Sequence, residues 1–350
     1  MPSISTVARW IGSSNRAGIL GHPKVTTPVR RRSEATPHAL IERSCWLIGI
    51  LASGLAIFLL STLGVTVEIR SLVLSLVPMS FLVAIRLVYG TWRPAPVLSN
   101  IGGAVAVLFL SIGMAGIISL VGLRYHYPLI DNALAKSDRS LGIDLPATIS
   151  WFAAHPALST LLGLAYDSSF LQLLGLVVLL SCLRRMDKLW ELAFVCSLTI
   201  VASTTISIFW PAIGAFAYFD YPTDILEKLP TDAGTYHLAK FEYYRNAAAP
   251  VLSFNSLQGV VTFPSFHCCL ALMTIFAVVG TGWLFRIVAA WNVLVMISTL
   301  PIGGHYVTDL AGGALLWLAC LSLAVMLRRW SAREPIPGDR LLAAEAGIAT

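Results

Sequence analysis

Charge is what this sequence has least of: only 12% of its 350 residues are Asp, Glu, Lys or Arg, whereas 57% are hydrophobic. Soluble domains carry about 25% charged and about 45–50% apolar residues. Half the usual charge cannot cover a water-facing surface of this size, which argues against an ordinary cytosolic protein. So much apolar sequence also argues against a disordered chain or an acidic tail. The composition favours a membrane protein.

Cysteine is also scarce, and its spacing gives no sign of a disulfide framework or a zinc site. The six cysteines all fall in or beside apolar runs, so we interpret them as small buried hydrophobic residues. The sequence predicts neither a bound metal nor a cofactor. A cleaved secretory signal is not expected either, because the first apolar run begins only after about 43 polar and basic residues.

Long apolar runs, by contrast, are abundant. A bilayer core of about 30 Å needs a helix of about 20 apolar residues, and eight runs qualify. They cover approximately residues 46–66, 71–89, 100–122, 157–182, 190–210, 264–281, 284–300 and 306–327. The sequence therefore predicts an all-α fold, a polytopic membrane helix bundle of about eight transmembrane helices.

The arrangement of these runs divides the chain into four predicted parts. They are a basic, disordered cytoplasmic tail (1–44), two accessory transmembrane helices (45–99), a six-helix core (100–327) and a second cytoplasmic tail (328–350). Two long hydrophilic stretches, 123–156 and 211–263, interrupt the core. Both are rich in aromatic residues, so we expect a lid or an interfacial platform rather than separate domains.

The distribution of positive charge predicts the orientation of the helices. With the N-terminus inside, 17 of the 24 Lys and Arg residues fall on inner segments and 7 on outer ones. Because positive charges concentrate on the cytoplasmic side, both termini are expected in the cytoplasm and both hydrophilic stretches on the outer face, periplasmic, extracellular or lumenal. The net charge of +6 then reflects topology, and no nucleic-acid partner is expected.

A short segment at residues 262–267, Thr-Phe-Pro-Ser-Phe-His, stands directly before an apolar run. Thr262 or Ser265 is suited to cap the helix that follows, and the proline suits its first turn. Either cap places His267 within about one turn of the start of that helix, at its outer end.

A second histidine, His305, follows two glycines between the seventh and eighth apolar runs, and Asp309 comes four residues later. Residues four apart share a helix face, where a carboxylate can fix the tautomer of an imidazole and stabilise its cation. The predicted topology puts His267 and His305 at the same depth, so we expect one site. The alternative is that the histidines are interfacial or packing residues and that Asp309 is a helix cap.

These two segments carry a family resemblance. Pro264-Ser265-x-His267 and Gly303-x-His305-x-x-x-Asp309 resemble the second and third signature motifs of the type 2 phosphatidic-acid phosphatase superfamily. Within it, the chain is similar over about residues 100–327 to the branch of fungal inositol-phosphorylceramide synthases and their bacterial relatives. Softer matches to that branch are Asp131, Asp138-x-x-x-Gly142-Ile143-Asp144, Ala165-Tyr166-x-Ser168 and Trp210-Pro211-Ala212-x-Gly214.

The resemblance implies phosphoryl transfer through a phosphohistidine without a metal. It makes His305 the nucleophile, oriented by Asp309, and His267 the acid that protonates the leaving oxygen. Ser265 would donate a hydrogen bond to the phosphate. Backbone N–H groups at the starts of both helices, with Gly304 beside them, would bind its charge.

The sequence departs from the family pattern in its basic residues. The first signature, Lys-x6-Arg-Pro, is absent, and Ser298-Thr299 stands where the third usually has Ser-Arg. Arg245 and Lys240, just before the second motif, are the expected substitutes for phosphate binding. The alternative is that both are ordinary interfacial charges, because long side chains near headgroups commonly are.

Three functions remain open from the sequence. The favoured one is transfer of a phosphoryl or phospho-headgroup from a phospholipid to a lipid alcohol such as ceramide or diacylglycerol. The others are hydrolysis of the same ester by water and a non-catalytic lipid transporter. Asp167, inside the fourth apolar run, is expected to bond a neighbouring helix or line a polar cavity, and His237 is expected to be a solvated loop residue.

Overall fold

The computed structural model of the protein describes residues 38–331. Residues 1–37 of the predicted tail 1–44 and residues 332–350 of the predicted tail 328–350 lie outside the described residues. The prediction of disorder for the first tail is wrong at residues 39–44, because the first helix begins at Ala39, before its apolar run. The last helix likewise extends through residues 328–331.

The predicted all-α helix bundle is confirmed. Within residues 38–331, six helices are long and apolar enough to cross a membrane: α1 (Ala39–Thr62), α2 (Ile69–Leu87), α3 (Pro96–Gly122), α6 (Pro156–Cys182), α7 (Met186–Phe209) and α13 (Val307–Ser331). The other two predicted spans are the shorter apolar helices α11 (Phe266–Ala277) and α12 (Trp283–Ser298), of 12 and 16 residues. The total of eight crossings stays a prediction.

The two hydrophilic stretches fold into short helices. The first holds α4 (Asp131–Ser140) and α5 (Leu145–Ala153), and the second holds α8 (Ala215–Phe219), α9 (Thr223–Leu226) and α10 (Leu238–Asn246). Shorter elements are the π-helix Val88–Trp92 and the 3₁₀ turns Leu123–Tyr125 and Phe254–Ser256. Strand β1 (Thr66–Val67) pairs in parallel with β2 (Val251–Leu252) and joins the loop after α1 to the second stretch.

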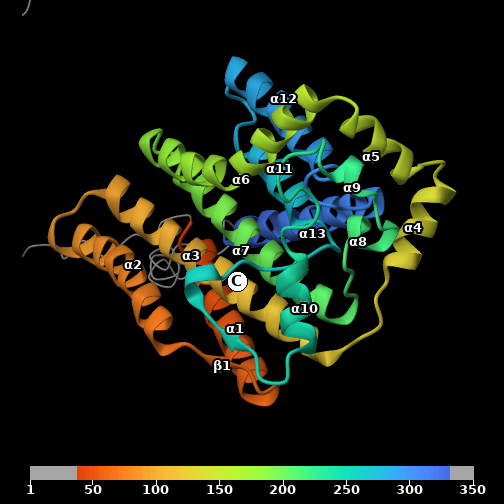
Figure 1. The fold of residues 1–350 in the computed structure, drawn as a ribbon. Coiled ribbons are helices and arrows are strands. Elements are labelled where there is room, and N and C mark those ends of the chain that lie inside the picture. The colour runs from red at the N-terminus through yellow and green to blue at the C-terminus, as the bar shows by residue number, and fades with distance from the viewer. Residues whose placement is uncertain (1–37, 332–350) are drawn as a thin grey trace, which may run out of the picture. The chain divides into compact units, whose positions relative to one another are not determined.

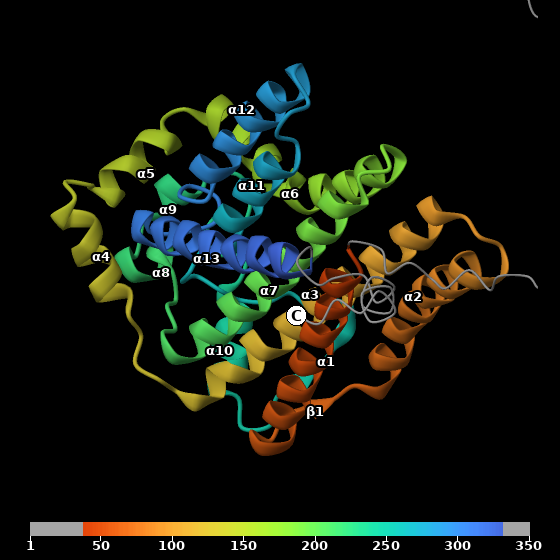
Figure 2. The same cartoon turned by 180° about the vertical axis from the view of Figure 1, so that it is seen from behind.

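Helix α7 lies at the centre of the bundle. It packs against α1, α3, α6, α11 and α13. In Figure 1, α1, α2 and α3 lie to one side of α7, and α13, α4 and α5 lie to the other side. The view from behind in Figure 2 has the same order, reversed. In contrast, α2 has only Ser71 buried and lies at the edge. The all-round apolar sequence of α7 is thus explained, since every face contacts another helix.

Ion pairs gather at the end of the bundle where α7 begins and α13 ends. Glu191 is buried there and accepts hydrogen bonds from Lys188 (3.2 Å) and Arg328 (2.9 Å), and Glu42 pairs with Arg86. Because α13 runs from this end to the opposite one, its first turn, with Asp309, lies at the far end of the helix from these charges.

Candidate active site

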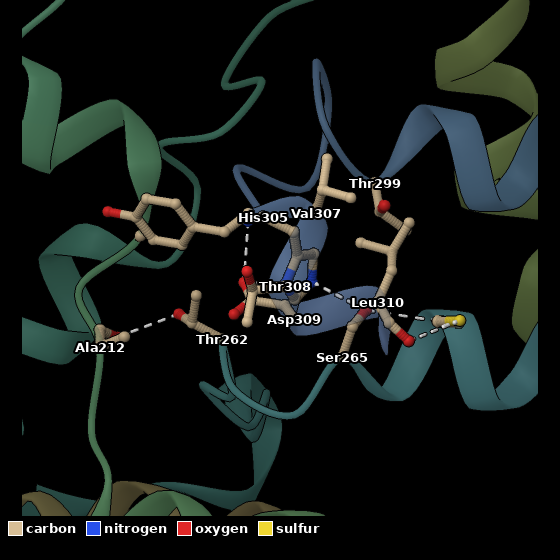
Figure 3. A network of polar contacts seen from close by, with 12 residues as sticks. Ala212, Thr262, Ser265, Thr299, His305, Val307, Thr308, Asp309 and Leu310 are labelled. Atoms are coloured by element: carbon tan, nitrogen blue, oxygen red, sulfur yellow. Dashed lines mark hydrogen bonds and ion pairs between the residues drawn. The ribbon is translucent and has the colours of Figure 1, made fainter. Parts of the chain in front are cut away.

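His305 lies in a tight turn between α12 and α13 and is 3% exposed. Its Nδ1 lies 3.2 Å from Oδ2 of Asp309, in the first turn of α13, and the backbone N–H of Tyr306 donates to the same oxygen at 2.9 Å. An Asp309 carboxylate bonded at Nδ1 holds a proton on that nitrogen and leaves the lone pair on Nε2. Figure 3 shows the ring between Asp309 and Ser265.

Ser265 brings the second motif to the other side of the His305 ring. Its Oγ lies 3.4 Å from Nε2 of His305, and its backbone N–H donates to the carbonyl oxygen of Asp309 at 3.0 Å. Ser265 is the N-cap of α11, accepting from the N–H of Cys268, whereas Thr262 donates to the carbonyl oxygen of Ala212. Of the two possible caps, the structure therefore selects Ser265.

His267 is linked to the turn through Tyr166 of α6. The two rings stack with centroids 4.1 Å apart and planes at 21°. A Cβ atom at Gly303 would lie 3.0 Å from Cε2 of Tyr166, 2.9 Å from Cδ2 of His305 and 2.7 Å from the carbonyl oxygen of Thr299. Only glycine fits between these groups, so Tyr166 lies against both motifs. No role for Tyr166 at the site was predicted from the sequence.

Two buried aspartates of α4 hold the His305 turn from behind. Asp138, 1% exposed, accepts hydrogen bonds from the N–H groups of Val307 (2.8 Å) and Thr308 (2.9 Å) and from Oγ1 of Thr308 (2.6 Å). Asp131, 2% exposed, accepts from the hydroxyl of Tyr306 at 3.0 Å. The expectation that the start of α13 presents free N–H groups to phosphate is wrong for Val307 and Thr308, because a carboxylate already caps them.

Asp131 also fixes the loop that covers the turn. Its two carboxylate oxygens accept from the N–H groups of Ile213 (3.0 Å) and Gly214 (2.9 Å). The carbonyl oxygen of Gly304 accepts from the N–H of Ala215 at 2.8 Å. Gly304 has a positive φ of 72°, and a Cβ there would lie 3.1 Å from Gly234. The turn geometry and this close approach explain the glycine without a bound anion.

The predicted phosphate-binding cations contact other groups. Arg245 donates to the carbonyl oxygen of Tyr127 at 2.9 Å and lies over the ring of Phe241, and Lys240 donates to Gln258 at 3.0 Å. Partial burial lowers the pKa of both Lys240 and Arg245. Nη1 of Arg245 is buried with no hydrogen-bond partner among the described residues. Binding of phosphate by either side chain stays a prediction.

His237, which the sequence suggested was solvated, is 5% exposed, so that expectation is wrong. Its Nε2 lies 2.7 Å from the carbonyl oxygen of Ile213, next to Gly214. Burial lowers the pKa of His237, and the nearby His305 lowers it further, while the contact with Ile213 opposes the shift. No sequence signal separates it from the exposed loop histidines His126 and His155, because its burial depends on how the second hydrophilic stretch folds over the turn.

Within residues 38–331, no group of three or more His, Cys, Asp or Glu side chains is arranged to hold a metal ion. The groups that converge are instead the imidazole of His305, the carboxylate of Asp309 and the hydroxyl of Ser265. A second imidazole, that of His267, stacks on Tyr166 beside them. Such a set can hold a nucleophilic nitrogen in one tautomer and supply a proton nearby.

The fold and this pairing define an α-helical membrane protein in which a carboxylate holds a buried histidine beside a serine-capped helix. A model of the PAP2 superfamily matches residues 132–323, more than half of the chain and including both histidine motifs. The chain belongs to the PAP2 superfamily, whose members are generally phosphatases or phosphotransferases. No curated protein and no solved structure matches it.

Proposed function

We propose that the protein transfers a phosphoryl or phospho-headgroup on lipid phosphate esters through a phosphohistidine on His305, at the outer face of the membrane. The observation that carries the proposal is the orientation of the His305 ring. Its Nδ1 is occupied by Asp309, and its Nε2 faces Ser265. A neutral imidazole held in this way can attack phosphorus without a metal.

In the first step, Nε2 of His305 attacks the phosphorus of the lipid ester, and an N–P bond forms as the bond to the leaving alcohol oxygen breaks. His267 gives its proton to that oxygen, so that a neutral alcohol departs. Positive charge builds on the His305 ring and is stabilised by Asp309. Oδ1 of Asp309 has no hydrogen-bond partner among residues 38–331, so this carboxylate keeps an acceptor site that can stabilise the cation.

In the second step, the hydroxyl of an acceptor attacks the same phosphorus. The N–P bond breaks, the electrons return to Nε2, and His267, now neutral, takes the acceptor's proton. A lipid alcohol such as ceramide or diacylglycerol as acceptor gives a transferase, and water gives a phosphatase. We favour the transferase, as in the inositol-phosphorylceramide synthase branch, because of the family resemblance and the missing third-motif arginine.

Binding of the phosphate is assigned to Ser265, Gly304, Arg245 and Lys240. At Gly304 the donor is its own N–H, because those of Gly303 and His305 already donate to the carbonyl oxygens of Ser298 and Thr299. The free Nη1 of Arg245 supports its inclusion, although both cations have other partners at rest. The start of α11 adds N–H groups that no residue within the helix can satisfy.

Purified protein in vesicles, given a labelled phospholipid with ceramide or diacylglycerol, tests the proposal. A labelled lipid product is expected, with full activity in chelator and loss of activity in His305→Ala. Free phosphate as the sole product would establish the phosphatase instead. The transporter would be favoured if the wild type showed no ester chemistry and both the wild type and His305→Ala moved lipid across the bilayer.

A further inference from the structure

Asp167 is an exposed carboxylate in the middle of a membrane-spanning helix. It is the twelfth residue of the 27-residue α6, about 16 Å along the axis from the first residue and about 22 Å from the last. It lies on a stripe of exposed apolar side chains formed by Leu164, Phe170, Leu171 and Leu174. This stripe points away from the bundle interior, and we expect it to face the acyl chains of the bilayer.

Asp167 makes no hydrogen bond or ion pair with any residue between 38 and 331. The polar groups on the neighbouring face of α6 are occupied elsewhere: Ser168 accepts from Trp291 at 2.9 Å, and Gln172 accepts from Asn292 at 2.8 Å. The expected bond from Asp167 to a neighbouring helix is therefore not formed. A carboxylate within a membrane-spanning helix is costly, so it usually marks a functional contact.

The position of Asp167 connects it with the candidate active site. The preceding residue, Tyr166, stacks on His267, and its hydroxyl lies 2.9 Å from the hydroxyl of Tyr236. Burial raises the pKa of Tyr236, the hydrogen bond with Tyr166 opposes this, and the charge of Asp167 adds to the increase. The field of the carboxylate thus reaches the hydroxyl pair beside His267.

The charge of Asp167 selects what can bind there. A carboxylate in a medium of low dielectric repels a phosphate strongly and binds hydroxyl donors strongly. A lipid can reach it sideways from the bilayer, because the flanking stripe is apolar and exposed. The reaction proposed for His305 needs one such neutral molecule, namely the lipid alcohol that accepts the transferred group.

We propose that Asp167 is the docking residue for the hydroxyl group of a neutral lipid alcohol, which enters from the bilayer along α6 and meets the phosphorylated His305 beside Tyr166. This inference rests on the proposed function and assigns a residue of α6 to its acceptor. Asp167 receives a hydrogen bond from the alcohol on entry, and the proton lost on transfer goes to His267.

The first test measures binding without catalysis. Full-length His305→Ala protein in vesicles is photolabelled with a photoactivatable diacylglycerol or ceramide, with and without Asp167→Leu. We expect Asp167→Leu to reduce labelling of α6 at least tenfold. A control, Leu164→Asp/Asp167→Leu, keeps one carboxylate on the stripe but moves it by about one turn, and it should not restore labelling.

The second test uses catalytically intact protein and measures the ratio of lipid transfer to hydrolysis. Asp167→Leu should lower this ratio at least tenfold and raise the KM for the alcohol, whereas a general structural defect would lower both reactions and leave the ratio unchanged. The proposal would be overturned if Asp167→Leu left the ratio of transfer to hydrolysis unchanged or was photolabelled as strongly as the protein with Asp167. It would also be overturned if a long-chain amine competed with the photolabel better than the lipid alcohol does, or if Asp167→Leu changed the oligomeric state while labelling stayed the same. If the wild type transfers nothing but labelling still needs Asp167, only the proposed function fails.

Discussion

Four aspartates near the candidate site divide into two kinds. Asp131, Asp138 and Asp309 are at most 2% exposed and receive hydrogen bonds from the backbone of the segments they hold. Asp167 is exposed on an apolar stripe and receives none from residues 38–331. The buried aspartates fix where His305 lies, because each bond to a carboxylate removes freedom from the turn. Asp167 holds no segment of the described chain in place, so we look for its partner among molecules outside the chain.

The largest effect is expected for Asp309→Asn. An amide at this position no longer fixes the proton on Nδ1 of His305. In the other tautomer the proton sits on Nε2, which then has no lone pair with which to attack phosphorus. Activity should fall about 10⁴-fold, the loss typical of a histidine deprived of its carboxylate. Turnover of labelled phospholipid measures this, and unchanged thermal stability serves as its control. A loss below tenfold would mean that Asp309 is only a helix cap.

Asp138→Asn comes next, and it affects stability as well as turnover. The side-chain amide nitrogen of the new asparagine cannot accept a hydrogen bond. At least one of the donors at the start of α13, the N–H of Val307 or the N–H and hydroxyl of Thr308, would then be buried without a partner. We expect the free energy of unfolding to fall by about 1–3 kcal/mol. Asp167→Asn is the matched comparison, and because it removes a carboxylate from lipid it should leave stability equal or higher. Equal losses in the two variants would erase the distinction between the two kinds of aspartate.

Replacement of Tyr166 separates stacking from hydrogen bonding. Tyr166→Phe keeps the ring over His267 and loses only the bond to Tyr236, so a change in kcat below about threefold is expected. Tyr166→Leu removes the stack and should lower kcat by about tenfold or more, because an unsupported acid is misplaced. Steady-state rates of both variants decide the matter, and equal losses would indicate that the hydroxyl pair matters more than the stack.

The smallest effect concerns pH and His237. Its pKa in the folded protein lies below the ordinary 6.5, so the unfolded chain binds a proton that the folded protein excludes. The contribution to stability is complete above pH 6.5 and is lost as pH falls, by at most about 1.4 kcal/mol per pH unit. Thermal midpoints in detergent between pH 7.5 and 5 should decline less in His237→Asn than in the wild type. If the thermal midpoints of the two proteins fell equally with pH, His237 would have the same pKa in the folded and unfolded states.

Much of the fold could be predicted because the bilayer imposes a simple rule. Apolar runs of about 20 residues become helices, and the first five runs with the last coincide with helices of spanning length. The runs near 264–281 and 284–300 differ because α11 and α12 end after 12 and 16 residues. Two glycines with positive φ, at 280 and 282, lie in the connection between these helices, and hydropathy alone does not weigh such positions.

The meeting of Ser265, His305 and Asp309 could also be predicted, since spacing and topology both point to it. The roles of Asp131 and Asp138 could not, because α4 is far from the His305 turn in sequence and no periodicity reports a contact across more than 160 residues. The sequence placed Asp167 in a span but could not tell which face of α6 it occupies. Its exposure emerges only once α11 and α12 cover the other faces of that helix.

The most direct measurement is a search for phosphate on His305 itself. Purified protein is mixed with a phospholipid carrying labelled phosphorus, quenched within one turnover, and digested for peptide mapping. We predict acid-labile, alkali-stable label on the peptide containing His305, absent from His305→Ala and discharged when a lipid alcohol is added. Turnover of the lipid without any label on that histidine, or label on His267 instead, would contradict it.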